Sequence, residues 1–383
     1  MTRRGFTVLS GLITCAACAF TMGSRLYYFG GLLLLLLLAY SLASALWALW
    51  TLHLSQSVSA SSVYRGESAQ LFLRIRHSCL LPIAPIRGQF SWARQQGECI
   101  FPSRPFREHT RRLPLAARHV GQYGAGVSFL EIADLFGLFA FRRRLKAPPA
   151  LLTVLPRPFD IEKPRMILGD DGRAALSRTQ EDYNAPEDVR AYIPGDAMKR
   201  IHWKLSSRRR ELLVRRFEMP APPDTLIFLD CAQPLGGEHL PEGKESLIDA
   251  LCETAVAVAQ MQMQDGSPVR LPIYGERANE FSSDHAENLS LLQEMLALQP
   301  FRQGEDFARV LQAELRRMRR TGAAIIITTR LDPHIVEAVC SIRRMGPSAR
   351  LYLVTYTPEH PDDQPYVARL QHHLVEVCYV TPA

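Results

Sequence analysis

Two stretches without a charged side chain open the chain and constrain its fold more than any other feature. No Lys, Arg, Asp or Glu occurs within residues 5–24 or 26–64. The second stretch exceeds the roughly 20 apolar residues that a membrane-spanning helix needs. The first is shorter and contains polar residues, so it is the weaker candidate. The pattern predicts a two-helix transmembrane hairpin over residues 1–56.

A cleaved signal peptide is the alternative for residues 6–22. Arg3 and Arg4 would supply its basic start, and the small residues 17–19 its cleavage site. A cleaved first segment followed by a stop-transfer helix also leaves the rest of the chain inside. Arg25 stands alone in the turn of the hairpin, which agrees with the positive-inside rule. The sequence predicts a multi-pass protein of the cytoplasmic membrane whose soluble domains face the cytoplasm.

The part that follows the hairpin, residues 57–158, has short apolar runs broken by Gly, Pro and Ser. Residues 70–76, 126–132 and 151–155 are typical of strands. The histidines of this part have no metal-ligand spacing. A small antiparallel β-sandwich is expected here.

From Asp224 onward strands and helices alternate, which predicts a parallel sheet covered on both faces in an α/β domain over residues 221–383. Pro272 has no backbone N–H, so its strand is expected at the edge of the sheet. The expected strands are 225–229, 269–274, 323–329 and 351–356, and the expected helices are 247–258, 307–318 and 333–344.

A compact motif lies in the segment 159–220 that leads into the last domain. A structural interpretation has Pro194 and Gly195 forming a turn and Asp196 capping a short helix. Met198, Ile201 and Leu205 would share a face of that helix. In this interpretation Trp203 packs against the sheet, and Arg190 pairs with an acid.

A chemical interpretation groups Asp196, His202 and Lys204 as an acid–base or phosphate-handling site, because histidine titrates near neutral pH. The chain has no obvious nucleophile and no Gly-rich phosphate loop of the Walker type. The structural interpretation is therefore favoured, and no catalytic residue and no cofactor is assigned.

The motif resembles the signature of the bacterial membrane proteins grouped as domain of unknown function 58. The matching residues are Arg190, Tyr192, Pro194, Gly195, Asp196, Ile201, His202, Trp203 and Lys204. The two early apolar segments and the β domain agree with the family as well. The chain departs from the pattern at residues 184–188, where the family has an apolar residue and Gly, and at Ser207, where it has Ala.

This resemblance implies a von Willebrand factor type A-like, or Rossmann-like, last domain, in which Asp-x-Ser-x-Ser binds a metal. Asp230 stands at the first position, but the two serine positions hold Ala232 and Pro234, which offer no hydroxyl to a hard cation. Arg330 after a later strand would repel a cation. No metal is expected. The resemblance also implies a MoxR-type AAA+ ATPase as partner, in assembly or maturation of envelope complexes.

The net charge of +7 is concentrated in residues 199–216. Nucleic acid is an unlikely partner, because no series of stacking aromatic residues accompanies the cations. An anionic inner leaflet, an acidic protein surface and a merely solvated face remain open. The basic residues are Lys199, Arg200, Lys204, Arg208, Arg209, Arg210, Arg215 and Arg216, opposed only by Glu211.

Two functions are therefore considered. The favoured one is a membrane-anchored, non-catalytic interaction or scaffold protein. The alternative is an enzyme that acts on phosphorylated or membrane-linked substrates through Asp196, His202 and Lys204.

Overall fold

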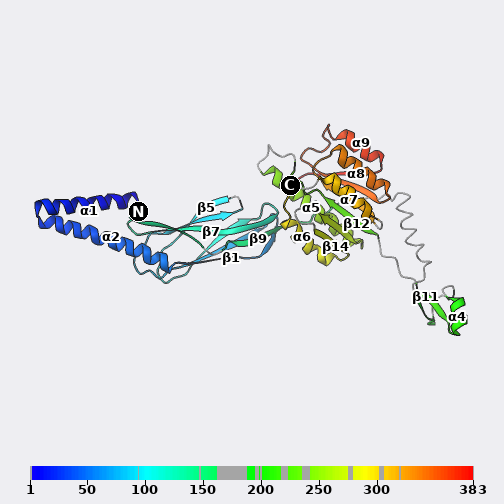
Figure 1. The fold of residues 1–383 in the computed structure, drawn as a ribbon, viewed down its shortest axis with the longest axis horizontal. Coiled ribbons are helices and arrows are strands. Elements are labelled where there is room, and N and C mark those ends of the chain that lie inside the picture. Colours follow the sequence, from blue (N-terminus) through cyan, green and yellow to red (C-terminus); the bar gives the residue numbers. More distant parts are fainter. Residues whose placement is uncertain are drawn as a thin grey trace. The chain divides into compact units, whose positions relative to one another are not determined.

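The chain forms two compact units, Met1–Leu155 and Pro156–Ala383 (Figure 1). Each unit has its own hydrophobic core. A computed structural model describes residues 2–93, 95–145, 148–161, 188–194, 198, 201–216, 223–234, 242–274, 279–301, 306–318 and 321–382.

The first unit begins with two antiparallel helices, α1 (Arg3–Met22) and α2 (Arg25–Thr51), joined by a tight turn. Small residues let the helices approach closely. A Cβ added at Gly11 would lie 3.7 Å from the side chain of Leu34, and one at Gly30 would lie 3.9 Å from Cys15. The turn is possible because Gly23 ends α1 with φ 63°, a left-handed conformation that suits glycine.

Both helices are long and apolar enough to cross a membrane by length and composition. Only 11% of the most apolar window of α1 and 22% of that of α2 are buried. The core helix of a soluble protein would instead be covered by other elements. The exposure of these apolar side chains to the surroundings agrees with association with a membrane.

The rest of the first unit consists of two sheets that share one core. One sheet has the order β1-β3-β6, and the other has the order β2-β9-β7-β4-β5 with β8 paired to β7. Ala48 and Leu52 at the end of α2 belong to the same core. The strands are β1 (His53–Val58), β2 (Ser62–Tyr64), β3 (Ser68–Arg76), β4 (Ile86–Trp92), β5 (Gln95–Phe101), β6 (His109–Ala116), β7 (Gly121–Ala133), β8 (Ala140–Arg144) and β9 (Ala150–Leu155).

The strands expected at 70–76, 126–132 and 151–155 are present as β3, part of β7 and β9. The pairing is not purely antiparallel, because β2 and β9 run parallel. These two strands lie far apart in the sequence, so no short turn dictates their direction. β1 starts at His53, inside the segment expected to belong to the hairpin.

A buried histidine makes the first unit sensitive to acid. His77 is 2% exposed, and neither ring nitrogen has a hydrogen-bond partner among the described residues. Burial, and secondly the nearby His109, lower the pKa of His77. The folded state therefore holds this ring neutral where the unfolded chain would already bind a proton.

We expect the stability of the first unit to be full above about pH 6.5, the ordinary histidine value, and to fall as the pH drops below it. His77→Phe should remove this part of the pH dependence. Thermal unfolding of the two proteins between pH 5 and pH 8 measures it. An unchanged slope in the variant would show that another group is responsible.

The second unit contains a six-stranded sheet with the order β14-β13-β12-β15-β16-β17, in which all strands but β14 run parallel. Numbered along the chain, this is the doubly wound order 3-2-1-4-5-6. The strands are β12 (Asp224–Leu229), β13 (Val269–Ile273), β14 (Asn279–Ser283), β15 (Thr321–Thr328), β16 (Ser348–Val354) and β17 (Glu376–Val380).

Helices cover both faces of this sheet. α7, α8 and α9 share the core of one face, and α5 with α6 packs on the other. They are α5 (Gly243–Gln264), α6 (Leu289–Leu298), α7 (Phe307–Glu314), α8 (Pro333–Arg344) and α9 (Gln364–His372), with the short 3-10 helices η3 (Ala286–Asn288) and η4 (Leu315–Arg317). Pro333 begins α8, as the sequence predicts, and Asp332 caps it by accepting from the backbone N–H of Ile335.

The expected edge position of the strand that contains Pro272 is wrong. β13 lies between β12 and β14, and the additional strand β14 forms the edge. The missing N–H of Pro272 is tolerated because β13 pairs with β12 only through Val269 and Arg270, before the proline is reached. β17 forms the opposite edge.

Candidate functional site

The first candidate site is the signature module, which we define as the described parts of residues 188–216. β10 (Asp188–Ala191) pairs antiparallel with β11 (Leu213–Arg216), and the short helix α4 (Trp203–Arg209) precedes β11. Ile201 forms an isolated bridge with Val214, and both side chains are buried. These contacts give the module a small apolar centre.

His202 caps the helix of this module. Its Nδ1 accepts the backbone N–H of Leu205 at 3.2 Å, and the backbone N–H of His202 donates to the carbonyl of Leu213 at 2.8 Å. The helix α4 begins at Trp203, because the two residues before it are bonded to β11: Ile201 forms a bridge with Val214, and the backbone N–H of His202 donates to Leu213. The imidazole thus has a structural partner at one of its two nitrogens.

Ser206 fastens α4 to β11. Its hydroxyl accepts the N–H of Leu213 at 2.9 Å and donates to the carbonyl of the same residue at 3.4 Å. The side chain is 6% exposed. The sequence interpretation assigned no role to Ser206, because its bonds to Leu213 join two elements and follow from the packing of α4 on β11.

Several apolar side chains of the module are exposed. Trp203 is 61% exposed, so the expectation that it packs against the sheet is wrong. Ile193 and Met198 are exposed to a similar extent, and Leu212 is 48% exposed. The exposed cations of the described part of the same module are Arg190, Lys204, Arg208, Arg209 and Arg210.

The remaining predicted signature residues are only partly described. Arg190 donates from Nη1 to the carbonyl of Ala191 at 3.2 Å, and the backbone N–H of Tyr192 donates to Leu212. Pro194 lies in a turn and is exposed. Gly195, Asp196, Lys199 and Arg200 lie outside the described residues, as do the side chains of Arg215 and Arg216. Of the trio considered for catalysis, the structure therefore describes His202 and Lys204.

Two substitutions separate capping by His202 from chemistry by its ring. Asparagine is a preferred capping residue, so His202→Asn should keep α4 folded, whereas His202→Ala should destabilise the module by about 1 kcal/mol. Hydrogen exchange of the α4 amides in the full-length protein measures the difference. If both variants lost protection equally, the capping role would be wrong.

The second candidate site is the switch point of the doubly wound sheet, where ligands of such folds collect. Asp230 follows β12 there, and its side chain is 4% exposed. Oδ2 accepts from the hydroxyl of Thr328 at 2.9 Å and lies 3.4 Å from Nε of Arg330, while Oδ1 accepts from the N–H of Ala232 at 3.1 Å. The carboxylate thus accepts two hydrogen bonds, from Thr328 and Ala232, and lies within ion-pair distance of Arg330, whose Nε forms no hydrogen bond among the described residues.

Cys231 lies beside this network. Burial, and secondly the charge of Asp230, raise the pKa of its thiol to about 12. The thiolate is the nucleophilic form of cysteine, so a raised pKa makes Cys231 a poor nucleophile at neutral pH. No cluster of three His, Cys, Asp or Glu side chains with the arrangement of a metal site occurs among the described residues.

Sequence reasoning also passed over the basic run Arg142–Arg143–Arg144 in β8. The run lines a pocket together with Leu49, Trp50 and Phe141. Three consecutive cations would have been a visible signal, but their nearness to the apolar helix α2 is a property of the tertiary structure.

A search among curated proteins found no match to this chain. Two solved structures show a distant likeness. The sporulation control protein Spo0M from Bacillus subtilis is 11% identical, with a TM-score of 0.17, over 37% of this chain and 58% of that chain. Cwp6 from Clostridium difficile is 8% identical, with a TM-score of 0.20, over 85% of this chain and 49% of that chain. The chain thus spans about half the length of these structures, and neither likeness carries an argument about fold or function.

One protein-family model matches the chain, and it covers residues 188–348, from the start of the signature module to the first residue of β16. The match therefore includes β10 and β11, the capping residue His202 and the switch point with Asp230 and Arg330. Over these residues the chain matches the family described as "Protein of unknown function DUF58".

Proposed function

We propose that this chain is a membrane-anchored, non-catalytic interaction protein whose signature module binds a partner protein. The observation that carries the proposal is the exposed indole of Trp203 among exposed cations of α4. Tryptophan and arginine are enriched among the residues that dominate the binding energy of interfaces. The cations favour a partner with an acidic surface.

The anchor we propose is the α1–α2 hairpin, which crosses the cytoplasmic membrane twice and leaves both units in the cytoplasm. Arg3 and Arg4 lie at the start of α1, and Thr2 just before them donates to the carbonyl of Gly137 in the β7–β8 turn. Basic residues thus gather at the end of the hairpin that carries the β strands, whereas Arg25 is alone at the other end. This distribution supports the cytoplasmic orientation.

We further propose that the α/β domain is a von Willebrand factor type A-like head and that the two sheets of the first unit form a β-sandwich spacer. The doubly wound strand order supports a Rossmann-like head. The resemblance to the family implies a MoxR-type AAA+ ATPase as the partner and the assembly or maturation of envelope complexes as the process.

An enzyme acting through Asp196, His202 and Lys204 is supported less well. Nδ1 of His202 is engaged by the start of α4, and the thiol next to Asp230 is a poor nucleophile. An interaction surface needs neither group to react. Function belongs to sites rather than folds, so the surface of the module is the place to test.

Crosslinked affinity capture of the full-length protein from its own membranes, with and without ATP, tests the proposal. Trp203→Ala should reduce the captured AAA+ ATPase at least tenfold, because an anchoring tryptophan commonly contributes about 2 kcal/mol or more. Leu291→Ala is the matched control, since Leu291 is a similarly exposed apolar residue, 59% exposed, in α6.

Equal capture by wild type and Trp203→Ala would show that the module is not the binding surface. Capture of no ATPase by any of the proteins would refute the proposed partner. In that case phosphate esters and lipid-linked compounds would be assayed as substrates, with His202→Asn as the variant that keeps the cap.

A further inference from the structure

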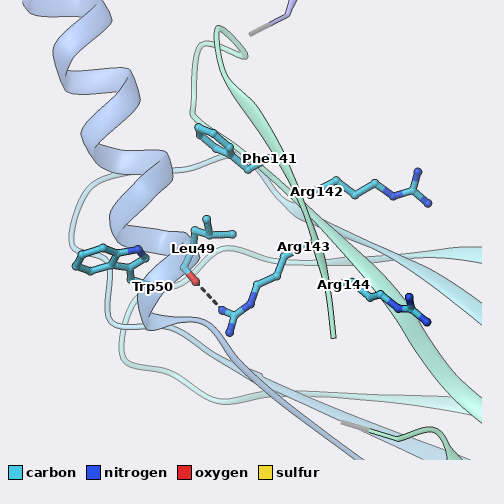
Figure 2. Close-up of a pocket in the computed structure, with 6 residues that line it drawn as sticks. All are labelled: Leu49, Trp50, Phe141, Arg142, Arg143 and Arg144. Carbon is cyan, nitrogen blue, oxygen red and sulfur yellow. Dashed lines mark hydrogen bonds between the residues drawn. The ribbon is translucent and has the colours of Figure 1, made fainter. Parts of the chain in front are cut away.

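We propose that an open pocket between the end of α2 and β8 binds the phosphate-bearing headgroup of an anionic phospholipid, with Arg143 as its principal ligand. The proposal rests on the membrane anchoring proposed above. It concerns a different part of the chain from the basic cluster of residues 199–216. Leu49, Trp50, Phe141 and the arginines of β8 line the pocket, which has a volume of about 640 Å³ (Figure 2).

The length of α2 places this pocket at the level of lipid headgroups. The hydrocarbon core of a bilayer is about 30 Å thick, and a helix rises about 1.5 Å per residue. Counted from Arg25 at one boundary, the hydrophobic core therefore ends near Ala45. Trp47 and Trp50 follow within the next two turns, where the headgroup layer lies and where tryptophan is enriched in membrane proteins. They are 42% and 84% exposed.

The turn that joins β7 to β8 gives independent support for placing the pocket at the level of the lipid headgroups. The ring of Phe136 in this turn packs edge-on against Tyr40 of α2, with 6.5 Å between the ring centroids. Phe136 and its neighbour Leu135 are 44% and 53% exposed. Two exposed apolar side chains beside the apolar part of α2 are suited to dip into the edge of the hydrocarbon layer. β8 leads away from this turn towards the headgroup level.

The side chains of β8 alternate between two faces. Arg143 points towards α2, and its Nη1 donates to the carbonyl of Leu49 at 2.7 Å (Figure 2). Arg142 points to the other face, where Nη2 donates to Gln89 at 2.6 Å and the guanidinium lies 4.2 Å from the ring centre of Phe129. Arg143 is therefore the arginine that faces the membrane-proximal helix.

The bond to Leu49 orients Arg143 without neutralising it. A backbone carbonyl accepts one of the five N–H groups of a guanidinium, and the charge remains. Among the described residues, no carboxylate forms an ion pair with Arg143. Guanidinium groups bind phosphate through paired N–H donors. The apolar walls formed by Leu49, Trp50 and Phe141 suit the glycerol and upper acyl region of the same lipid.

The test titrates the full-length protein in nonionic detergent with short-chain phosphatidylglycerol and follows the fluorescence of Trp50. Trp50→Phe identifies the signal of this residue. Short-chain phosphatidylcholine tests the need for net negative charge. Glycerol phosphate separates a lipid site from a site for free phosphate, because it carries the phosphate without acyl chains.

We expect phosphatidylglycerol to bind at least fivefold more tightly than phosphatidylcholine and glycerol phosphate. Arg143→Gln should weaken binding about five- to tenfold, since one cation near a membrane surface contributes about 1 kcal/mol. Arg143→Lys should weaken binding less than Arg143→Gln does, because lysine keeps the charge but not the paired donors. Arg112→Gln is the matched control, because it removes the same charge from an exposed arginine of β6 that does not line the pocket, and it should change the affinity less than twofold.

Equal losses in Arg143→Gln and Arg112→Gln would overturn the proposal, as would equal binding of phosphatidylcholine or of glycerol phosphate. Failure of this site is distinguishable from failure of the anchor. Alkaline carbonate extraction of native membranes reports on the anchor alone, whereas the titration in detergent reads the pocket whether or not the hairpin inserts.

Discussion

Replacing Arg270 by alanine should destabilise the α/β domain by about 3–5 kcal/mol, because it removes a cation shared by three carboxylates, of which Glu314 is buried and the other two are partly exposed. Arg270 lies 2.8 Å from Glu280 and 3.3 Å from Asp224. Its Nη2 is also 3.9 Å from Oε2 of Glu314, an oxygen that has no hydrogen-bond partner among the described residues. The side chain of Glu314 is 1% exposed.

The surroundings of Glu314 explain why water cannot replace the cation that Arg270→Ala removes. The hydroxyl of Tyr274 donates to Oε1 of Glu314, and burial, followed by this carboxylate, raises the pKa of Tyr274 to about 12. The tyrosine therefore stays neutral and supplies no charge. Arg317 also reaches Oε1, at 2.9 Å, but its side chain is 57% exposed.

Hydrogen exchange of β12, β13 and α7 in the full-length protein measures the effect of Arg270→Ala. Arg317→Ala is the control, and it should have a clearly smaller effect because the exposed partner of an ion pair contributes little. Equal losses of protection in the two variants would show that Arg270 does not hold the cluster together.

Replacing Arg330 by alanine should destabilise the switch point by about 2–3 kcal/mol, since it removes the cation next to a buried carboxylate. The effect should be smaller than that of Arg270→Ala. Asp230 keeps its bonds to the hydroxyl of Thr328 and to the N–H of Ala232. Asp230→Asn in the Arg330→Ala background should recover most of the loss, because an amide needs no counter-charge.

The same variants test the expectation that no metal binds at Asp230. Magnesium titrations by calorimetry should be unchanged in Asp230→Ala and should show no new binding in Arg330→Ala. Ala232 and Pro234 still provide no hydroxyl ligand once the arginine is removed. A magnesium isotherm that appears in Arg330→Ala would show that the arginine suppresses a working metal site.

Periodic apolar patterns allowed many of the elements to be predicted. The strands β3, β9, β12 and β15, and the helices α5, α7 and α8, lie where apolar spacing indicates them. β14 and β17 were missed, because edge strands are short and only partly buried, so their apolar pattern is weak. The predicted edge position of the strand that contains Pro272 was wrong for a related reason. A sequence does not reveal that the pairing of β12 with β13 ends before the proline.

The candidate site, like the fold, could be predicted from the sequence only in part. The motif from Arg190 to Lys204 was recognisable from the sequence, because it is contiguous and its residue types are uncommon in combination. The roles within it were not. The cap of α4 by His202 depends on the pairing of residue 201 with Val214, and the exposure of Trp203 depends on which side of α4 the strands cover.

The sequence by itself determined the two apolar helices, the change from a β part to an α/β part, and the family of the last domain. These properties arise from local composition and from short contiguous patterns, which depend only on residues close together in the sequence. Only the tertiary structure decided that Arg330 neutralises Asp230, that Arg270 joins three carboxylates, and that Arg143 faces the end of α2. Each of these contacts joins residues far apart in the chain, and its energy depends on burial and on distances of a few ångströms that no spacing in a sequence records.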